Sequence, residues 1–264
     1  TMCKPLHAGK AAQNGLFAAQ PVERGFTSRP DVLERPLGFG DTQSAGTDIA
    51  AALDDLGERF EIDSVLFKYH AACHGVHATI DALQSIAANE SIDPSDVELI
   101  DVAVQSEYLN ICGIDRPESG LEGKFSLRFC AALALAGEDT ASTDTYSDSK
   151  VKAPHLVELA EKTRVAAKPG MPMKVADVKV HLRDGVVHQL RGNVGIPASD
   201  LDAQWTKLVT KFLACAIPVI GDEKAEHAIK IVLQLEHAYN INELMQACSH
   251  KPEIDVRTRS PRSP

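Results

Sequence analysis

"ADVKVHLRDGVVHQL", residues 176–190, is the stretch that decides the fold class. Apolar residues alternate with charged or polar ones over 178–182, which is the period-two pattern of a half-buried strand. The dipeptide Asp184-Gly185 separates this run from a second short run, and a two-residue Asp-Gly link is a strong hairpin signal. The sequence therefore predicts two antiparallel strands joined by a tight turn.

Upstream segments supply a further strand and the helices that would cover it. "VELIDVAVQ", residues 97–105, alternates in the same way and predicts a strand. "KFSLRFCAALALAG" (124–137) and "APHLVELAEKTRV" (153–165) have the length and apolar spacing of helices. The middle of the chain is therefore predicted to be α+β.

Helical segments flank this part of the chain. A loop leads into an alanine-rich helix around 11–19, and residues 20–60 follow as a proline- and glycine-containing connector with short helical pieces. Beyond Pro197, apolar residues recur at helical spacing, and Ser199 is the expected N-cap. Residues 251–264 combine charge, proline and serine and are predicted to form a disordered tail.

Composition limits the classes of function. The 264 residues contain 27 Lys and Arg against 37 Asp and Glu, a net charge of −10 that opposes binding to nucleic acid or anionic membranes. The six cysteines lie far apart with no CxxC pair, which favours reduced thiols over a disulfide framework. The longest apolar stretch, residues 212–220, is too short to span a bilayer. We therefore expect a soluble cytoplasmic protein, in which an anionic ligand needs a locally basic pocket.

One stretch concentrates the side chains that carry chemistry. "LFKYHAACHGVHATIDAL", residues 66–83, contains Lys68, His70, Cys73, His74 and His77. Cys73 and His77 are four residues apart and could face one metal ion from a helix, with His70 and His74 as further ligands. A second Cys/His pair at finger-like spacing is lacking in the sequence, so structural or substrate-lining roles are favoured over a metal site. We expect neither a metal nor an organic cofactor.

The same stretch also fits an anion site. "SVLFKY" (64–69) is expected to be a strand, Gly75 allows a tight turn, and "VHATIDALQSI" (76–86) continues as a helix. Free amides at a helix N-terminus, the helix dipole and a cationic side chain such as Lys68 all favour a bound anion, with His74 beside them. A carboxylate ligand fits this arrangement better than a metal.

"CKPLHAGKAAQNG", residues 3–15, is the other candidate for chemistry. Lys4 and His7 precede a turn that Gly9 would permit, and Lys10 follows it. The alternative is the N-terminus of an ordinary helix with solvated lysines. Periodicity does not decide between these two interpretations.

Four motifs together resemble one known family. In this order along the chain, "TMCKPLHAGKAAQNGL" (1–16), "LFKYHAACHGVHATIDAL" (66–83), "GLEGKFSLRFCAALALAGE" (120–138) and "DLDAQWTKLVTKF" (200–212) resemble the C-terminal portion of the MmgE/PrpD family. The resemblance runs from the first residue to about Cys248. It implies a large helical domain into which a smaller α+β lid is inserted, with the active site in the cleft between them.

The resemblance also implies domain boundaries. Residues 1–45 would be a partial helical domain whose N-terminal half is expected upstream of this sequence. Residues 60–196 would be the lid, and residues 197–250 would return to the helical domain. A homodimer, or association with the missing helical half, is expected.

The family's chemistry moves a proton, water or carbon dioxide next to a carboxylate. At positions that match the motifs, Lys4 and Lys68 look like the family's active-site lysines, and His77 looks like the histidine that opens the next helix. Cys73 stands where some members have histidine and others cysteine, and His7 and His74 are further candidates for substrate binding. Phe129 stands where cis-aconitate decarboxylase has an active-site tyrosine, which disfavours decarboxylation.

The function implied by the resemblance is that of a lyase of the 2-methylcitrate dehydratase type, acting on a small di- or tricarboxylic acid. Two alternatives stay open. One is an epimerase or isomerase of an iminodisuccinate-like dicarboxylate, and the other is an incomplete fragment or subunit that binds carboxylates without turnover.

Overall fold

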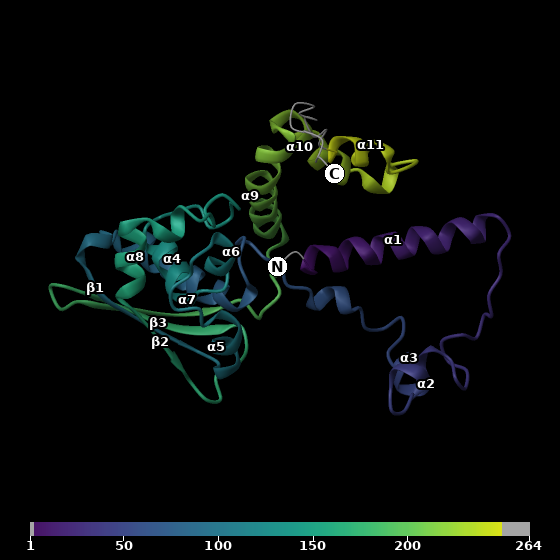
Figure 1. Ribbon diagram of the computed structural model, residues 1–264, viewed down its shortest axis with the longest axis horizontal. Coiled ribbons are helices and arrows are strands. Elements are labelled where there is room, and N and C mark those ends of the chain that lie inside the picture. The colour runs from purple at the N-terminus through teal and green to yellow at the C-terminus, as the bar shows by residue number, and fades with distance from the viewer. Residues whose placement is uncertain (1–2, 250–264) are drawn as a thin grey trace, which may run out of the picture. The chain divides into compact units, whose positions relative to one another are not determined.

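The computed structural model describes residues 3–249, without the side chains of residues 4 and 5. The predicted disordered tail at 251–264 lies outside the described residues. The chain divides after Asp63 into two compact units, and Figure 1 labels their elements. Eleven α-helices and one four-stranded sheet are described, so the predicted α+β class is confirmed.

The first unit is helical and exposed. Helix α1 (Cys3–Glu23) contains the alanine-rich stretch, with Pro21 in its last turn. Two short helices, α2 (Phe39–Gln43) and α3 (Ile49–Leu53), interrupt the connector as predicted. Large apolar side chains of this unit are exposed, among them Leu16 at 64% and Phe17 at 71%.

The second unit contains the sheet, whose strands are ordered β2-β1-β3-β4. They are β1 (Val97–Val104), β2 (Thr163–Ala167), β3 (Val175–Leu182) and β4 (Val187–Asn193). The predicted hairpin is confirmed, because β3 and β4 pair antiparallel and Gly185 has a φ of +90° in the turn. Strand β1 pairs antiparallel with β3 and parallel with β2.

Helices cover one face of the sheet, and Figure 1 shows α4, α7 and α8 on that side. They are α4 (His77–Glu90), α7 (Leu127–Leu135) and α8 (Pro154–Glu161). Ile80 and Leu83 of α4 and Leu133 of α7 are fully buried with the inward residues of β1 and β3. Burying such side chains removes apolar surface from water and stabilises the layer.

Small elements complete the α/β part, residues 64–196. Helices α5 (Ser106–Cys112) and α6 (Gly120–Gly123) follow β1. The hydroxyl of Ser126 caps α7 by accepting a hydrogen bond from the backbone N–H of Phe129, at 3.2 Å. This cap explains why the helix begins three residues later than the predicted range of 124–137.

Three local predictions were wrong. Residues 64–69 form no strand, since no neighbouring strand pairs with them in the described structure. The helix predicted at 153–165 ends at Glu161, and Thr163 instead begins β2 beside Ile100 of β1. Asp200, not Ser199, caps the following helix, because the Asp200 carboxylate accepts from the N–H of Ala203 at 2.9 Å.

The chain continues as α9 (Leu201–Ile220), α10 (Asp222–Val232) and α11 (Asn242–Ala247). Helix α9 contacts the α/β part through Lys211, whose Nζ donates to the carbonyl of Ala141 at 2.9 Å. None of the described helices has both the length and the apolar character that crossing a membrane requires.

Candidate functional site

The 66–83 stretch folds as an extended segment that leads into a short 3-10 helix, η2 (His74–Val76), and then α4. Lys68 is exposed, and its Nζ lies 3.5 Å from the carbonyl oxygen of Ala72. Neither Cys73 before η2 nor Val76 before α4 caps its helix with a side chain. The backbone N–H groups of Val76 and His77 are instead bonded within the turn, to the carbonyls of Cys73 and His74.

Three histidines form a row at this point. The ring of His77 contacts those of His70 and His74 edge-on, with centroids 4.8 and 5.0 Å apart. His77 is 1% exposed, whereas His74 is partly buried. Within residues 3–249, the Nε2 atoms of His74 and His77 are buried without a hydrogen-bond partner. Such atoms leave bonding capacity for a ligand or a water molecule.

Burial and neighbouring charges keep two of these rings neutral. Burial first, and then the neighbouring His70 and His74, lower the pKa of His77 to about 3. Burial, and then the charges of Lys68 and Lys174, also lower the pKa of His74. At neutral pH the two imidazoles are therefore uncharged.

Hydrogen bonds at both ring nitrogens hold His70 in place. Its Nδ1 lies 2.7 Å from the Thr140 hydroxyl, and its Nε2 lies 2.7 Å from a carboxylate oxygen of Asp81. Gln84 donates to the same hydroxyl at 3.2 Å, so the Thr140 hydroxyl can donate to Nδ1 while Nε2–H donates to Asp81. Both ring nitrogens are thus used, and His70 ties the site to α4.

Cysteines lie on the inner side of the same turn. Cys73 is partly buried, and its thiol is hydrogen-bonded to that of Cys112, while Cys112 and Cys130 are fully buried. The contact with Cys73 and burial raise the pKa of Cys112, and burial raises the pKa of Cys130. The Cys112 and Cys130 thiols are therefore poor nucleophiles, and the role of Cys73 stays a prediction.

Lys174, a residue that sequence patterns did not single out, also belongs to this site. It precedes β3, and its charge contributes to lowering the pKa of His74. Its backbone N–H donates to the hydroxyl oxygen of the buried Tyr108 at 3.1 Å. Neither Lys174 nor Tyr108 lies in a short sequence motif, so sequence patterns could not identify them as residues of this site.

The other predicted residues lie on α1 in the first unit. The side chain of Lys4 is outside the described part, and His7 is exposed. The structure therefore brings together Lys68, Cys73, His74 and His77, while the roles of Lys4 and His7 stay predictions.

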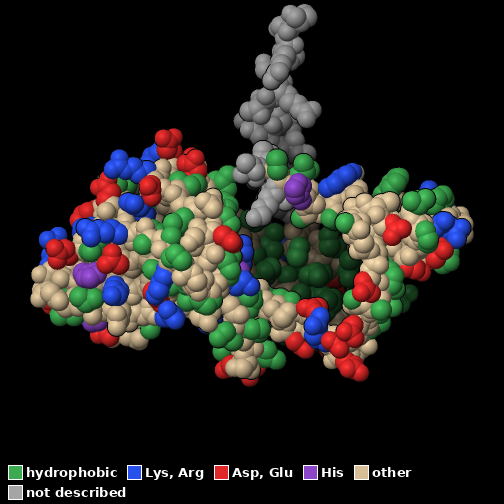
Figure 2. All heavy atoms as spheres, turned by 90° about the horizontal axis from the view of Figure 1, so that it is seen from below, with side chains coloured by type: hydrophobic (Ala, Val, Ile, Leu, Met, Phe, Trp, Pro, Cys, Tyr) green, Lys and Arg blue, Asp and Glu red, His purple; other side chains and the backbone are tan. Residues whose placement is uncertain are grey.

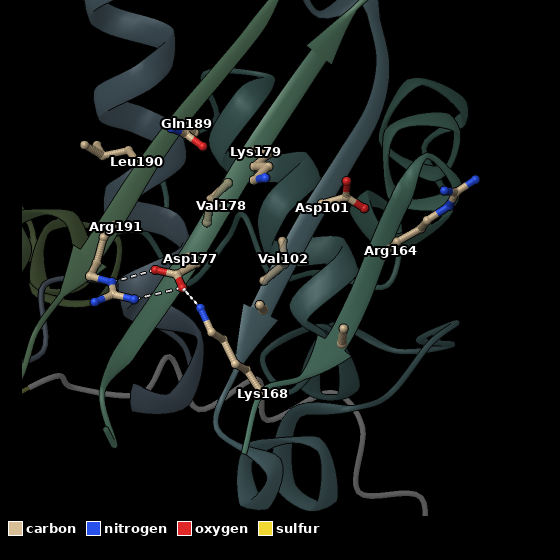
Figure 3. A pocket seen from close by; sticks show the side chains of 12 residues that line it. Asp101, Val102, Arg164, Lys168, Asp177, Val178, Lys179, Gln189, Leu190 and Arg191 are labelled. Carbon is tan, nitrogen blue, oxygen red and sulfur yellow. Dashed lines mark hydrogen bonds and ion pairs between the residues drawn. The ribbon is translucent and has the colours of Figure 1, made fainter. Parts of the chain in front are cut away.

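A larger hollow, of about 670 Å³, lies on the open face of the sheet (Figure 3). The Asp177 carboxylate there binds Arg191 at 2.6 and 2.9 Å and Lys168 at 2.7 Å. These partners hold the pKa of Asp177 well below its usual range. Basic and acidic side chains are interspersed on the surface seen in Figure 2. Asp177, Arg191 and Lys168 of this hollow thus pair with one another, as on a solvated sheet face.

Comparison with known proteins adds independent information. The family model "MmgE/PrpD C-terminal domain" matches residues 70–237. Human cis-aconitate decarboxylase is 26% identical over 278 residues, which covers 99% of this chain and 56% of the relative. The mouse protein of the same name is 24% identical over 253 residues, covering 89% of this chain and 50% of the relative. The chain spans about half the length of the curated relatives it matches.

In residues 3–249, no group of three or more His, Cys, Asp or Glu side chains is placed to hold a metal ion.

Proposed function

The chain belongs to the MmgE/PrpD family, and from this premise we propose that it is a lyase of the 2-methylcitrate dehydratase type, acting on a small di- or tricarboxylic acid. The observation that carries the proposal is that the charges of two lysines act on a neutral histidine, which is a candidate proton acceptor. Lys68 and Lys174 act on the neutral His74, whose Nε2 is without a partner among the described residues. In a chain of net charge −10, such a local excess of positive charge favours an anionic ligand.

The proposed chemistry follows from these groups. Lys68 neutralises a substrate carboxylate and stabilises the enolate-like charge that builds when the adjacent C–H proton is removed. His74, whose ring is only partly buried, accepts that proton, because a neutral imidazole is a suitable general base. The hydroxyl group on the neighbouring carbon takes this proton from His74 and leaves as water, which completes the double bond and returns His74 to its neutral form. The proposal needs no metal or organic cofactor.

The remaining candidates take supporting roles. His77 is too buried to meet substrate in this structure, so we assign it the role of positioning the His74 ring, which it contacts edge-on. Lys4 would bind a second carboxylate-bearing part of the substrate, and Cys73 and His7 would line the site.

Decarboxylation is the second candidate, because both curated relatives are cis-aconitate decarboxylases. Phe129, at the position of the expected tyrosine, is 2% exposed and packs edge-on against Tyr146. A buried phenyl ring offers no hydroxyl for proton transfer, which favours dehydration. Epimerisation stays a third candidate, since it begins with the same proton removal.

The test incubates the 264-residue chain with 2-methylcitrate, citrate or cis-aconitate in D2O and follows products by NMR. Dehydration gives a new alkene signal, epimerisation gives deuterium at the α-carbon without an alkene, and decarboxylation releases carbon dioxide. We expect dehydration, with kcat/KM reduced about 100-fold or more in Lys68→Ala, because an electrostatic contact to the developing charge is lost. Lys179→Ala, on the open sheet face, is the matched control. Decarboxylation or epimerisation without dehydration would favour the other candidates, and absence of dehydration on every acid would refute the proposal.

A further inference from the structure

A hollow of about 580 Å³ is lined by residues of α4, of the loop 138–141 and of α9. Its volume is within the usual range for small-molecule sites. Lys68 and His74, which act on substrate in the proposed reaction, are not among the residues that line it. A ligand of this hollow would therefore be additional to the proposed substrate.

The α9 part of the hollow is positively charged. Lys207 and Lys211 are four residues apart on this helix, so their side chains share one face of it. Lys207 is exposed, and its Nζ lies 5.4 Å from the centre of the Tyr69 ring. Lys211 is partly buried, and its Nζ donates to the carbonyl oxygen of Ala141 at 2.9 Å. A carbonyl does not neutralise an ammonium charge, so both lysines favour an anionic group in the hollow.

The part formed by α4 and the loop is negatively charged, since it contains the carboxylates of Asp81, Glu138 and Asp139. Two of these carboxylates already have partners. Asp81 lies 2.7 Å from His70 Nε2, and the Glu138 carboxylate accepts from Lys150 Nζ at 2.7 Å. Asp139 is exposed, and within residues 3–249 no ion pair joins it to a cation. The Asp139 carboxylate is thus left to pair with a cationic group.

Charges of opposite sign come near each other at Ala141. Lys211 Nζ is hydrogen-bonded to the carbonyl oxygen of Ala141, and Asp139 Oδ1 accepts the N–H of the same residue at 2.9 Å. Because the backbone of one residue separates them, the ammonium nitrogen and the carboxylate oxygen are at most about 9 Å apart. Since no ion pair joins these two groups in the described part of the chain, a gap is left between them.

The two ends of this gap match an α-amino acid. Its carboxylate and ammonium groups are attached to one carbon, and a charged hydrogen bond at each end adds about 2.8 Å, so the ligand spans a gap of about 8 to 9 Å. A dicarboxylate without an ammonium group would instead bring negative charge to Asp139, and a simple amine would bring positive charge to Lys211. Lys207, one turn along α9, is left for a second carboxylate.

We propose that this hollow is a binding site for an acidic α-amino acid, with Lys211 on the α-carboxylate, Asp139 on the ammonium group and Lys207 on the side-chain carboxylate. Neutral amino acids lack the group for Lys207, and dicarboxylic acids lack the group for Asp139. His70 also lines the hollow and contacts the ring of His77. The bound amino acid therefore lies beside the row of histidines in the candidate site.

A comparison of L-glutamate with glutarate tests this directly, because the two acids differ by the α-ammonium group. Binding of each to the 264-residue chain is measured by calorimetry at low salt, with thermal unfolding in parallel. We expect glutamate to bind about tenfold or more tightly than glutarate, since its bond to Asp139 is charge-assisted. Lys179→Ala, on the open sheet face, is the control and should change neither affinity.

Two variants test the two ends of the ligand. Asp139→Asn keeps an oxygen for the N–H of Ala141 but loses the charge, so it should raise the Kd for glutamate about tenfold and leave that for glutarate unchanged or lower. Lys207→Met should also raise the Kd for glutamate about tenfold, because the side-chain carboxylate loses its cation. Both residues are exposed, so the melting temperature should stay the same.

Other outcomes overturn the proposal. Equal affinity of the wild type for glutamate and glutarate would indicate a simple anion site, and a wild type that binds no glutamate at millimolar concentration would refute the site altogether. An unchanged Kd for glutamate in both variants would place the bound acid elsewhere. Weaker binding together with a lower melting temperature in both variants would indicate a loss of structure instead of a loss of ligand contacts. These results do not depend on whether the chain dehydrates an acid, because binding alone is measured.

Discussion

His77 makes the stability of the α/β part depend on pH. Its pKa is about 3 in the folded chain, against 6.5 for a solvated histidine. The unfolded chain therefore binds a proton first as the pH falls, and folding loses free energy between about pH 6.5 and pH 3. Each pH unit in this window costs about 1.4 kcal/mol. Acidification to about pH 5 should lower the free energy of unfolding by about 2 kcal/mol through this residue alone.

Urea unfolding followed by circular dichroism at about pH 7.5 and about pH 5 measures the effect. Asparagine at position 77 keeps a side-chain N–H donor but does not titrate, so His77→Asn should lose about 2 kcal/mol less than the wild type on acidification. His155→Asn is the control, because the side chain of His155 is 62% exposed. Equal pH dependence in wild type and His77→Asn would refute the assignment of His77 as a buried neutral imidazole.

Further predictions concern packing, surface charge and assembly. Gly192→Ala would place a Cβ 2.0 Å from the carbonyl oxygen of Ala78 and should destabilise the chain by about 3 kcal/mol in urea unfolding; Gly46→Ala, with nothing within 4 Å, is the control. Asp177→Asn weakens the bonds to Arg191 and should cost about 1 kcal/mol in the same assay, since Arg191 is exposed; a loss of several kcal/mol would contradict a screened ion pair. Sedimentation should give a dimer, because large apolar side chains are exposed on α1; a monomer at micromolar concentration would contradict this.

Local patterns in the sequence predicted much of the fold. The β3–β4 hairpin follows from alternation around Gly185, and α4 follows from apolar spacing after Gly75. Strand β2 was missed, because its five residues follow α8 directly and the sequence lacks a turn between them. Its pairing with β1 is parallel and joins residues more than sixty positions apart, which periodicity does not report. Residues 64–69 show the opposite error. Their apolar run predicted a strand, but a strand also needs a neighbouring strand to pair with.

The candidate site was predictable where it is local. Lys68, His74 and His77 lie within ten residues, so a turn into a helix brings them together. Lys174 is 100 residues from His74, and its conformation depends on a hydroxyl supplied by Tyr108 of α5. Such a contact exists once the hairpin and α5 have folded, and the sequence contains no pattern for it.

The charges around His74 connect ligand binding to proton transfer. In the free chain, burial and then the charges of Lys68 and Lys174 lower the pKa of His74, so its ring stays neutral and adds no repulsion to the site. In the proposed complex, a substrate carboxylate pairs with Lys68 and offsets part of the charge that disfavours a proton on the ring. His74 then becomes a stronger base when the acid is bound. Because His77 behind it is buried and neutral, it opposes this change less than a charged ring would. The lysine that binds the substrate can thereby also strengthen the base that acts upon it.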